Sequence, residues 1–186
     1  ALYHSIGDMN LNPEERQQKL DLYKNAYDQL AAALDRYPED MWDFKPGPER
    51  WSIREIVVHI ADSEANSYIR CRRAIAESGA AVMAYDEDRW AAGLGYQEQN
   101  SRAALELFKH LRGMTYNLIR GLPDAAWSNT IEHPENGTMT LDDWLVVYAN
   151  HVPEHIYQIQ ATHDAWLAAK KGQPRDPAAS LFCHIQ

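Results

Sequence analysis

The sequence has few cysteines, no long apolar run and fewer basic than acidic residues, and each shortage excludes a class of protein. Only Cys71 and Cys183 are cysteines, so the disulfide framework of a small secreted domain is not expected. No apolar run approaches the roughly 18 residues that a membrane-spanning helix needs, and the first residues lack a secretory pattern. We therefore expect a reduced cytoplasmic protein that does not cross a membrane.

The charge balance makes nucleic acid an unexpected partner. The chain has 27 acidic residues against 18 lysines and arginines, which gives a net charge of −9. Such a field repels a polyanion on average. A local basic cluster exists at Arg70, Arg72 and Arg73, but three arginines on one helix are typical of a solvated face.

The length of 186 residues predicts a single domain with a sizeable core. Apolar residues recur every three or four positions in four segments, and no segment alternates with period two for long. Proline and glycine interrupt the pattern between these segments. The predicted helices are 13–36, 52–79, 100–121 and 140–170, with a short helical turn near 86–91 and loops elsewhere. We place the core of the domain at 13–170 and a surface tail at 171–186.

One sequence unit occurs twice in the chain, at a spacing of 85 residues from Pro38 to Pro123. It contains the pattern Pro-x-x-x-Trp, a loop, a helix cap of the form Ser/Thr-x-x-Glu/Asp, and then a helix that carries a histidine. The two copies span Pro38–His59 and Pro123–His151. Their tryptophans, Trp42 and Trp127, are expected in the core. These features predict an all-α, up-and-down four-helix bundle built from two pseudo-repeated helical hairpins, in which the second and fourth helices are equivalent neighbours.

Three histidines are candidate metal ligands. His151 and His155 are four residues apart, so they lie on one face of the last helix, and His59 occupies the second helix. Three imidazoles with one open position are typical of a catalytic metal site. The alternative is that the pair packs inertly at the edge of the core and that His59 faces solvent. Pro153 lies between the paired histidines and is expected to kink the helix there.

The sequence words around these histidines resemble the DinB-like superfamily. They are Trp51-Ser-Ile-Arg-Glu-Ile-Val-Val-His59 and His151-Val-Pro-Glu-His155, and the resemblance extends over about 14–166. It implies a four-helix bundle that holds one divalent transition metal, with zinc or nickel preferred, on His59, His151 and His155. Similar proteins are thiol-dependent transferases or metal-dependent hydrolases. The resemblance therefore implies a thiol S-transferase or a hydrolase acting on a small molecule, with a low-molecular-weight thiol as a candidate co-substrate.

Several other residues near the histidines are candidate site residues. Asp62 and Glu154 lie within one helical turn of a candidate ligand and are the candidate catalytic carboxylates, although a surface position is the simpler reading for each. The candidate pocket walls are Asn66, Trp144 and Tyr148. The alternative function is a non-catalytic metal-binding module for stress response or interaction. The aromatic content leaves room for a homodimer.

Overall fold

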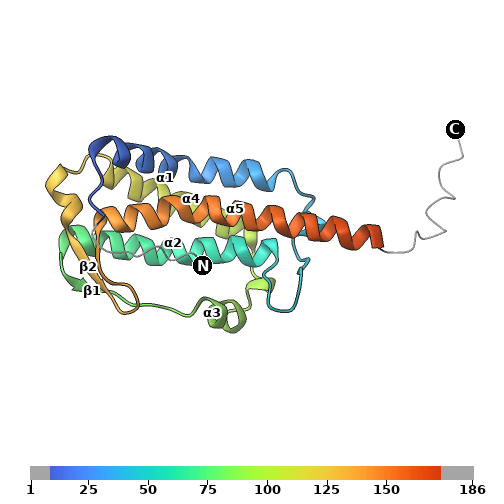
Figure 1. Cartoon of the computed structure of the whole chain (residues 1–186). Coiled ribbons are helices and arrows are strands. Elements are labelled where there is room, and N and C mark those ends of the chain that lie inside the picture. The colour runs from blue at the N-terminus through green and yellow to red at the C-terminus, as the bar shows by residue number, and fades with distance from the viewer. Residues whose placement is uncertain (1–8, 173–186) are drawn as a thin grey trace, which may run out of the picture.

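A computed structural model describes residues 9–172 and consists mainly of four long helices (Figure 1). Their bounds are α1 Pro13–Leu34, α2 Ile53–Ala76, α4 Ser101–Ile119 and α5 Leu141–Gly172. A short helix, α3, spans Glu87–Gly93. The predicted all-α four-helix bundle is confirmed. The predicted tail at 171–186 lies almost wholly outside the described residues.

Helix starts follow the caps in the sequence. The side chain of Ser52 accepts a hydrogen bond from the backbone of Glu55, whose carboxylate accepts one from the backbone of Ser52. Thr140 and Asp143 make the same pair of bonds at the start of α5. Each reciprocal pair satisfies backbone donors that have no partner within the helix. The two predicted caps therefore set the first residues of the two helices that carry the histidines.

The repeated prolines and tryptophans also adopt equivalent structures. Pro38 and Pro123 each precede a short 3₁₀ helix, Glu39–Met41 and Asp124–Ser128 respectively. Trp42 and Trp127 are both buried at these turns, as the repeat predicts.

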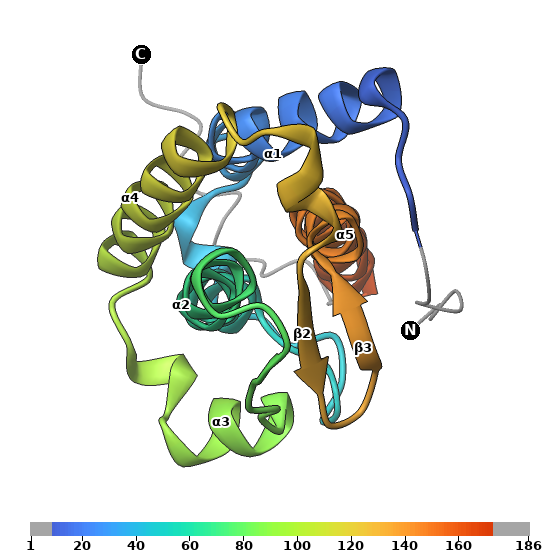
Figure 2. The ribbon, with the colours of Figure 1, turned by 90° about the vertical axis from the view of Figure 1, so that its left-hand side faces the viewer.

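The helices are not neighbours in simple sequence order. Both α1 and α2 pack on α4 and α5, and the end-on view places α1 and α2 diagonally across the bundle (Figure 2). The colours of Figure 1 show that α1 and α5 run one way while α2 and α4 run the other. The reason is the long connection over 77–100, which returns along the bundle before α4 begins. The two helices of each predicted hairpin therefore face each other diagonally, and α2 and α5 are antiparallel neighbours.

A small sheet replaces part of two segments that were predicted as loops. β1 (Ala80–Ala81) pairs in parallel with β2 (Thr130–His133), and β2 pairs antiparallel with β3 (Gly137–Thr140). These strands are too short to display a clear alternation in the sequence. Gly137 adopts a positive φ of 73° at the turn between β2 and β3, where glycine is strongly favoured.

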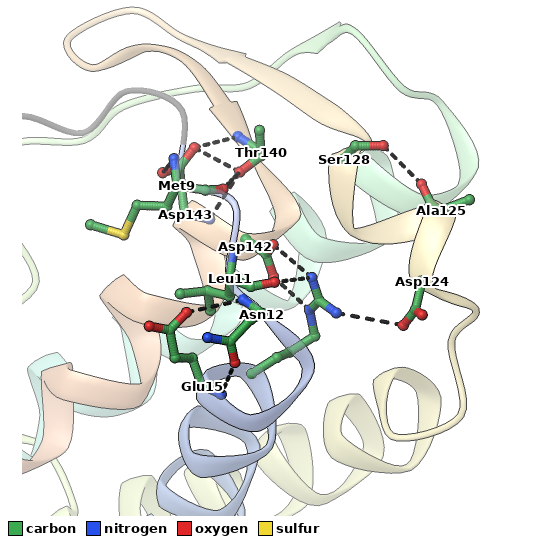
Figure 3. A network of polar contacts seen from close by, with 11 residues as sticks. Met9, Leu11, Asn12, Glu15, Asp124, Ala125, Ser128, Thr140, Asp142 and Asp143 are labelled. Carbon is green, nitrogen blue, oxygen red and sulfur yellow. Dashed lines mark hydrogen bonds and ion pairs between the residues drawn. The ribbon is translucent and has the colours of Figure 1, made fainter.

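The segment before α1 forms hydrogen bonds with residues at the start of α5 (Figure 3). Asp142 accepts hydrogen bonds from the backbone of Leu11 and from the Arg16 guanidinium, at 2.8–3.1 Å. Asp143 accepts one from the backbone of Met9 at 3.2 Å. These contacts fix the position of α5 relative to α1. Within residues 9–172, no helix has the length and apolar character needed to cross a bilayer.

Candidate metal centre

Three histidine side chains from two helices meet at one point inside the bundle. The Nε2 atom of His151 lies 3.3 Å from Nε2 of His59 and 3.0 Å from Nε2 of His155. One ring nitrogen from each residue lies within 4.8 Å of the others. His59 is buried, which excludes the solvent-exposed alternative, and the other two are half-buried.

The antiparallel packing of α2 on α5 brings these histidines together. His59 lies in the second turn of α2, and His151 and His155 lie in the middle of α5. Because the pair is four residues apart, both rings project from the same face of α5. Pro153 lies between them, and α5 continues across it from Leu141 to Gly172.

The surroundings keep the three imidazoles neutral. Burial is the main cause in each case, and it lowers the pKa of His59 to about 3. Burial and the neighbouring histidines lower the pKa of His151 well below its usual range. The pKa of His155 is also lowered by burial, although a hydrogen bond to Gln158 partly opposes the shift. Neutral rings offer the lone pairs that a metal ion requires.

Gln158 orients the ring of His155, and the sequence analysis did not predict this contact. Its Oε1 atom lies 2.8 Å from Nδ1 of His155. An amide oxygen only accepts hydrogen bonds, so Nδ1 of His155 carries the proton and Nε2 presents its lone pair to the cluster. Gln158 follows His155 by three residues, and that spacing was the available signal. The ring of His59 is instead held by packing, because its centroid lies 4.7 Å from that of Trp51. Its buried Nδ1 atom has no hydrogen-bond partner.

The spacing of the nitrogens fits a transition metal. Zinc binds imidazole nitrogen at about 2.0–2.1 Å in tetrahedral geometry, which separates two ligand nitrogens by about 3.3 Å. The two nitrogen–nitrogen separations in the cluster, 3.0 and 3.3 Å, are close to that value. Neutral imidazoles that point their lone pairs at one another repel unless a cation or a proton lies between them. The donor set therefore suits zinc, nickel or a similar divalent ion.

The two candidate carboxylates lie in different surroundings. Asp62 is half-buried, and its Oδ2 atom accepts a hydrogen bond of 2.5 Å from the hydroxyl of Tyr96. Glu154 is exposed and lines a shallow depression with Asn150, Pro153 and Tyr157. The histidines do not line that depression.

The three candidate pocket walls also differ in position. Trp144 is fully buried and packs between Tyr23 and Tyr148 at 5.5 Å from each ring. Tyr148 lies beside His151 with 6.2 Å between ring centroids, and its hydroxyl accepts a hydrogen bond from Arg70. The side chain of Asn66 donates to the carbonyl of Asp62 within α2. Tyr148 is thus the member of this set in direct contact with the histidine cluster.

Sequence comparison relates this chain to bacterial proteins. A model of the DinB superfamily matches residues 22–159. YfiT of Bacillus subtilis is 29% identical over 163 residues, which make up 85% of this chain and 92% of YfiT. A protein of Oceanobacillus iheyensis is 32% identical over 109 residues, 59% of this chain, and the match spans only 63% of that protein. Both carry the provisional name of metal-dependent hydrolase.

Two solved structures share the fold. YfiT is described as a probable metal-dependent hydrolase with an unusual four-helix bundle topology; it has a TM-score of 0.78 and 24% identity, and the match covers 90% of this chain and 94% of YfiT. The mycothiol-dependent maleylpyruvate isomerase has a TM-score of 0.63 at 14% identity, over 77% of this chain and 60% of the isomerase. At these identities the structures establish the fold alone. Since the family model covers more than half of the sequence, the chain belongs to the DinB superfamily.

Proposed function

We propose that this protein is a divalent-metal-dependent enzyme acting on a small molecule, with His59, His151 and His155 as the metal ligands. The observation that carries the proposal is the convergence of three neutral imidazole nitrogens, two of them 3.0 and 3.3 Å from the third. Among residues 9–172 no fourth histidine, cysteine or carboxylate joins this cluster. Three protein ligands leave a coordination position for a reactant, as catalytic sites require.

Thiol S-transfer and hydrolysis are the two reactions we propose. A zinc or nickel ion bound there would act as a Lewis acid and lower the pKa of a coordinated thiol or water. The provisional names of the sequence relatives support hydrolysis. The shared fold of a mycothiol-dependent isomerase supports a low-molecular-weight thiol as co-substrate.

Asp62 is the residue we propose to accept a proton from the thiol or water. It lies one turn after His59 on α2, and Tyr96 occupies only one of its two oxygens. The other oxygen is free to receive a proton. Glu154 is a weaker candidate because it lines a separate surface depression. Tyr148 and Asn66 are proposed to border the substrate, whereas the burial of Trp144 favours a packing role.

A non-catalytic metal-binding module is the alternative. A structural metal site normally has four protein ligands and is often rich in cysteine. The described residues contribute three ligands to this cluster, and Cys71 is buried with a thiol whose pKa is raised to about 12 by burial. We therefore favour the enzyme, and we further propose that it is a single cytoplasmic domain that forms a homodimer.

The test is metal content followed by a reaction screen. Elemental analysis of the purified protein should find about one divalent ion per chain, lost in His59→Ala and His155→Ala. His110→Ala is the matched control, since His110 is exposed on α4 and outside the cluster. The loaded protein should then conjugate a low-molecular-weight thiol to an electrophile or hydrolyse a small substrate. Failure to retain zinc or nickel after reloading would refute the proposal.

A further inference from the structure

We propose that Arg70 forms a subsite for the carboxylate of the substrate or co-substrate, one tyrosine side chain away from the histidine cluster. The proposal rests on the proposed function, because it assigns the chemical class of the molecule that the same site binds. The sequence analysis interprets Arg70, together with Arg72 and Arg73, as part of a solvated helix face. The structure instead turns its guanidinium toward Tyr148.

The guanidinium of Arg70 is held in place by two hydrogen bonds. Nη1 donates to the hydroxyl of Tyr148 at 2.8 Å, and Nη2 donates to the carbonyl of Met83 at 2.6 Å. A guanidinium has five N–H donors, so three are left for a ligand. Both contacts are with neutral groups, and neither compensates the charge of the arginine.

Several other arginines of the bundle are paired with a carboxylate, whereas Arg72, which is also half-buried, contacts the neutral oxygens of Tyr68 and Thr115. Arg16 and Arg112 each contact a carboxylate at 2.7–2.8 Å. Arg73, three residues after Arg70 on the same helix, pairs with Glu77 at 2.8 Å. Within residues 9–172 no carboxylate lies within 4.0 Å of Arg70, although its side chain is half-buried. A partly buried guanidinium without an anion favours binding one, and its planar donors match a carboxylate.

Tyr85 provides a second, independent sign of a missing partner. Its buried hydroxyl has no partner of good hydrogen-bond geometry among the described residues, although the Ser63 hydroxyl lies close enough to lower its pKa. Tyr85 follows Met83 by two residues, and the Met83 carbonyl accepts a hydrogen bond from Arg70, which also lowers the pKa of Tyr85. A buried hydroxyl without a partner costs roughly 1–3 kcal/mol. A ligand oxygen held by Arg70 would give the Tyr85 hydroxyl an acceptor.

The position of Arg70 suits a ligand that also reaches the histidines. It follows His59 by eleven residues, which is close to three full helical turns, so both lie on one face of α2. On α5, Tyr148 precedes His151 by three residues and lies beside its ring at 6.2 Å. Helical side chains lean toward the start of the helix, which directs Arg70 toward His59. The proposed subsite and the histidine cluster therefore lie on the same side of α2, where one extended ligand reaches both.

The charge of Arg70 contributes to the pKa shifts of two other titratable groups, His133 and Glu87. His133 has its pKa lowered by burial and then by Arg70, so it is neutral at pH 7 and does not compensate the arginine. Glu87 is the carboxylate that opposes the proposal, since its charge interacts with Arg70. Burial and three nearby carboxylates raise the pKa of Glu87, and its carboxylate does not lie within 4.0 Å of the Arg70 guanidinium.

The test compares how tightly thiols of increasing chain length bind to the cobalt-substituted protein. Two series bind cobalt through sulfur, the mercaptocarboxylates from 3-mercaptopropionate to 8-mercaptooctanoate and the mercaptoalcohols of the same lengths. Their dissociation constants are measured from the thiolate-to-cobalt absorption band, which requires no enzymatic activity. At one or two chain lengths the wild type should bind the carboxylate roughly tenfold more tightly than the alcohol, as expected for a charged hydrogen bond.

Two variants decide the outcome. Arg70→Gln should lose the preference for carboxylate while binding the mercaptoalcohols with unchanged affinity, which also shows that the metal site is intact. Arg73→Gln removes the same charge from the same helix and should keep the preference. A wild type without a preference, or a preference retained in Arg70→Gln, overturns the subsite but leaves the metal site standing. Failure to bind cobalt would instead overturn the proposed metal site, whereas cobalt binding without a thiolate band for any thiol would overturn the thiol-dependent reaction and the subsite together.

Discussion

The Oε1 atom of Gln158 lies 2.8 Å from Nδ1 of His155, which is the residue three positions earlier in α5. This contact selects the tautomer of His155 that directs Nε2 toward His151 and His59. The buried Nδ1 atom of His59, by contrast, has no hydrogen-bond partner. Gln158 should therefore affect the metal affinity of the proposed site although it is not one of the proposed ligands.

Replacing Gln158 tests that role. We expect Gln158→Leu to weaken zinc binding by about 10- to 100-fold, since the ring loses its orienting acceptor. Gln158→Glu keeps an acceptor at the same place and should retain wild-type affinity or exceed it. Competition with a chromophoric chelator measures both. Equal affinities in Gln158→Leu and the wild type would show that packing alone orients His155.

A buried ion pair lies in the core that supports α2. Arg112 on α4 donates two hydrogen bonds to Glu64 on α2, at 2.9 and 2.7 Å, and both residues are at most 2% exposed. Tyr23 on α1 donates a third bond to Glu64 at 2.8 Å. The network joins three helices, and removal of one partner leaves an uncompensated charge in the core.

Arg112→Met should accordingly lower the free energy of unfolding by about 3–5 kcal/mol, measured by urea denaturation. Adding Glu64→Gln to that variant should restore part of the loss, because the unpaired carboxylate is removed. Arg73→Gln, which breaks an exposed pair with Glu77, should cost about 0–1 kcal/mol. A double variant no more stable than Arg112→Met would argue that packing of the arginine stem, rather than charge, dominates.

The sequence predicted the helices well because their signals are local. The reciprocal caps at Ser52 and Thr140 each lie within four residues, and they fix the starts of α2 and α5. The order of helices around the bundle depends on where 77–100 travels, and no local pattern encodes that path. The sheet was missed for a similar reason, since β1 has two residues and acquires its partner Ile131 from about fifty residues away.

The residue types of the histidine cluster could be predicted from the sequence, but the contacts that surround the cluster could not. The spacing of His151 and His155 implied a shared face, whereas the meeting with His59 depends on the packing of α2 against α5. Tyr96, which binds Asp62, comes from the connection before α4. Contacts of this kind follow from tertiary structure, so a single sequence carries no direct signal for them.

Pro153 lies inside a helix that continues on both sides. Proline has no N–H, so the carbonyl of Ala149 lacks its usual donor four residues later. Pro153→Ala restores that donor and should raise the free energy of unfolding by roughly 2 kcal/mol, the helix gain less the entropy that proline removes from the unfolded chain. Urea denaturation of the metal-free protein measures the change. An unchanged or lower stability would mean that the helix has adapted fully to the proline.

His133 links acid stability to the turn between β2 and β3. Its Nδ1 atom accepts hydrogen bonds from the backbone of Glu135 and Asn136, both at 3.3 Å. Protonation of Nδ1 would remove that acceptor. Burial, followed by the charge of Arg70, lowers the pKa of His133 below its usual value of 6.5, while Glu135 opposes the shift.

Because the folded-state pKa is depressed, the contribution of His133 to stability is complete above pH 6.5 and is lost as the pH falls through the folded-state pKa. His133→Asn keeps a side-chain acceptor for the turn but does not titrate. We expect the melting temperature of the metal-free wild type to fall more steeply than that of His133→Asn as the pH decreases from about 6.5 to 5. The clustered histidines titrate in both proteins, so the difference between the two curves isolates His133. Parallel curves over this range would show that His133 exchanges its proton equally in the folded and unfolded chains.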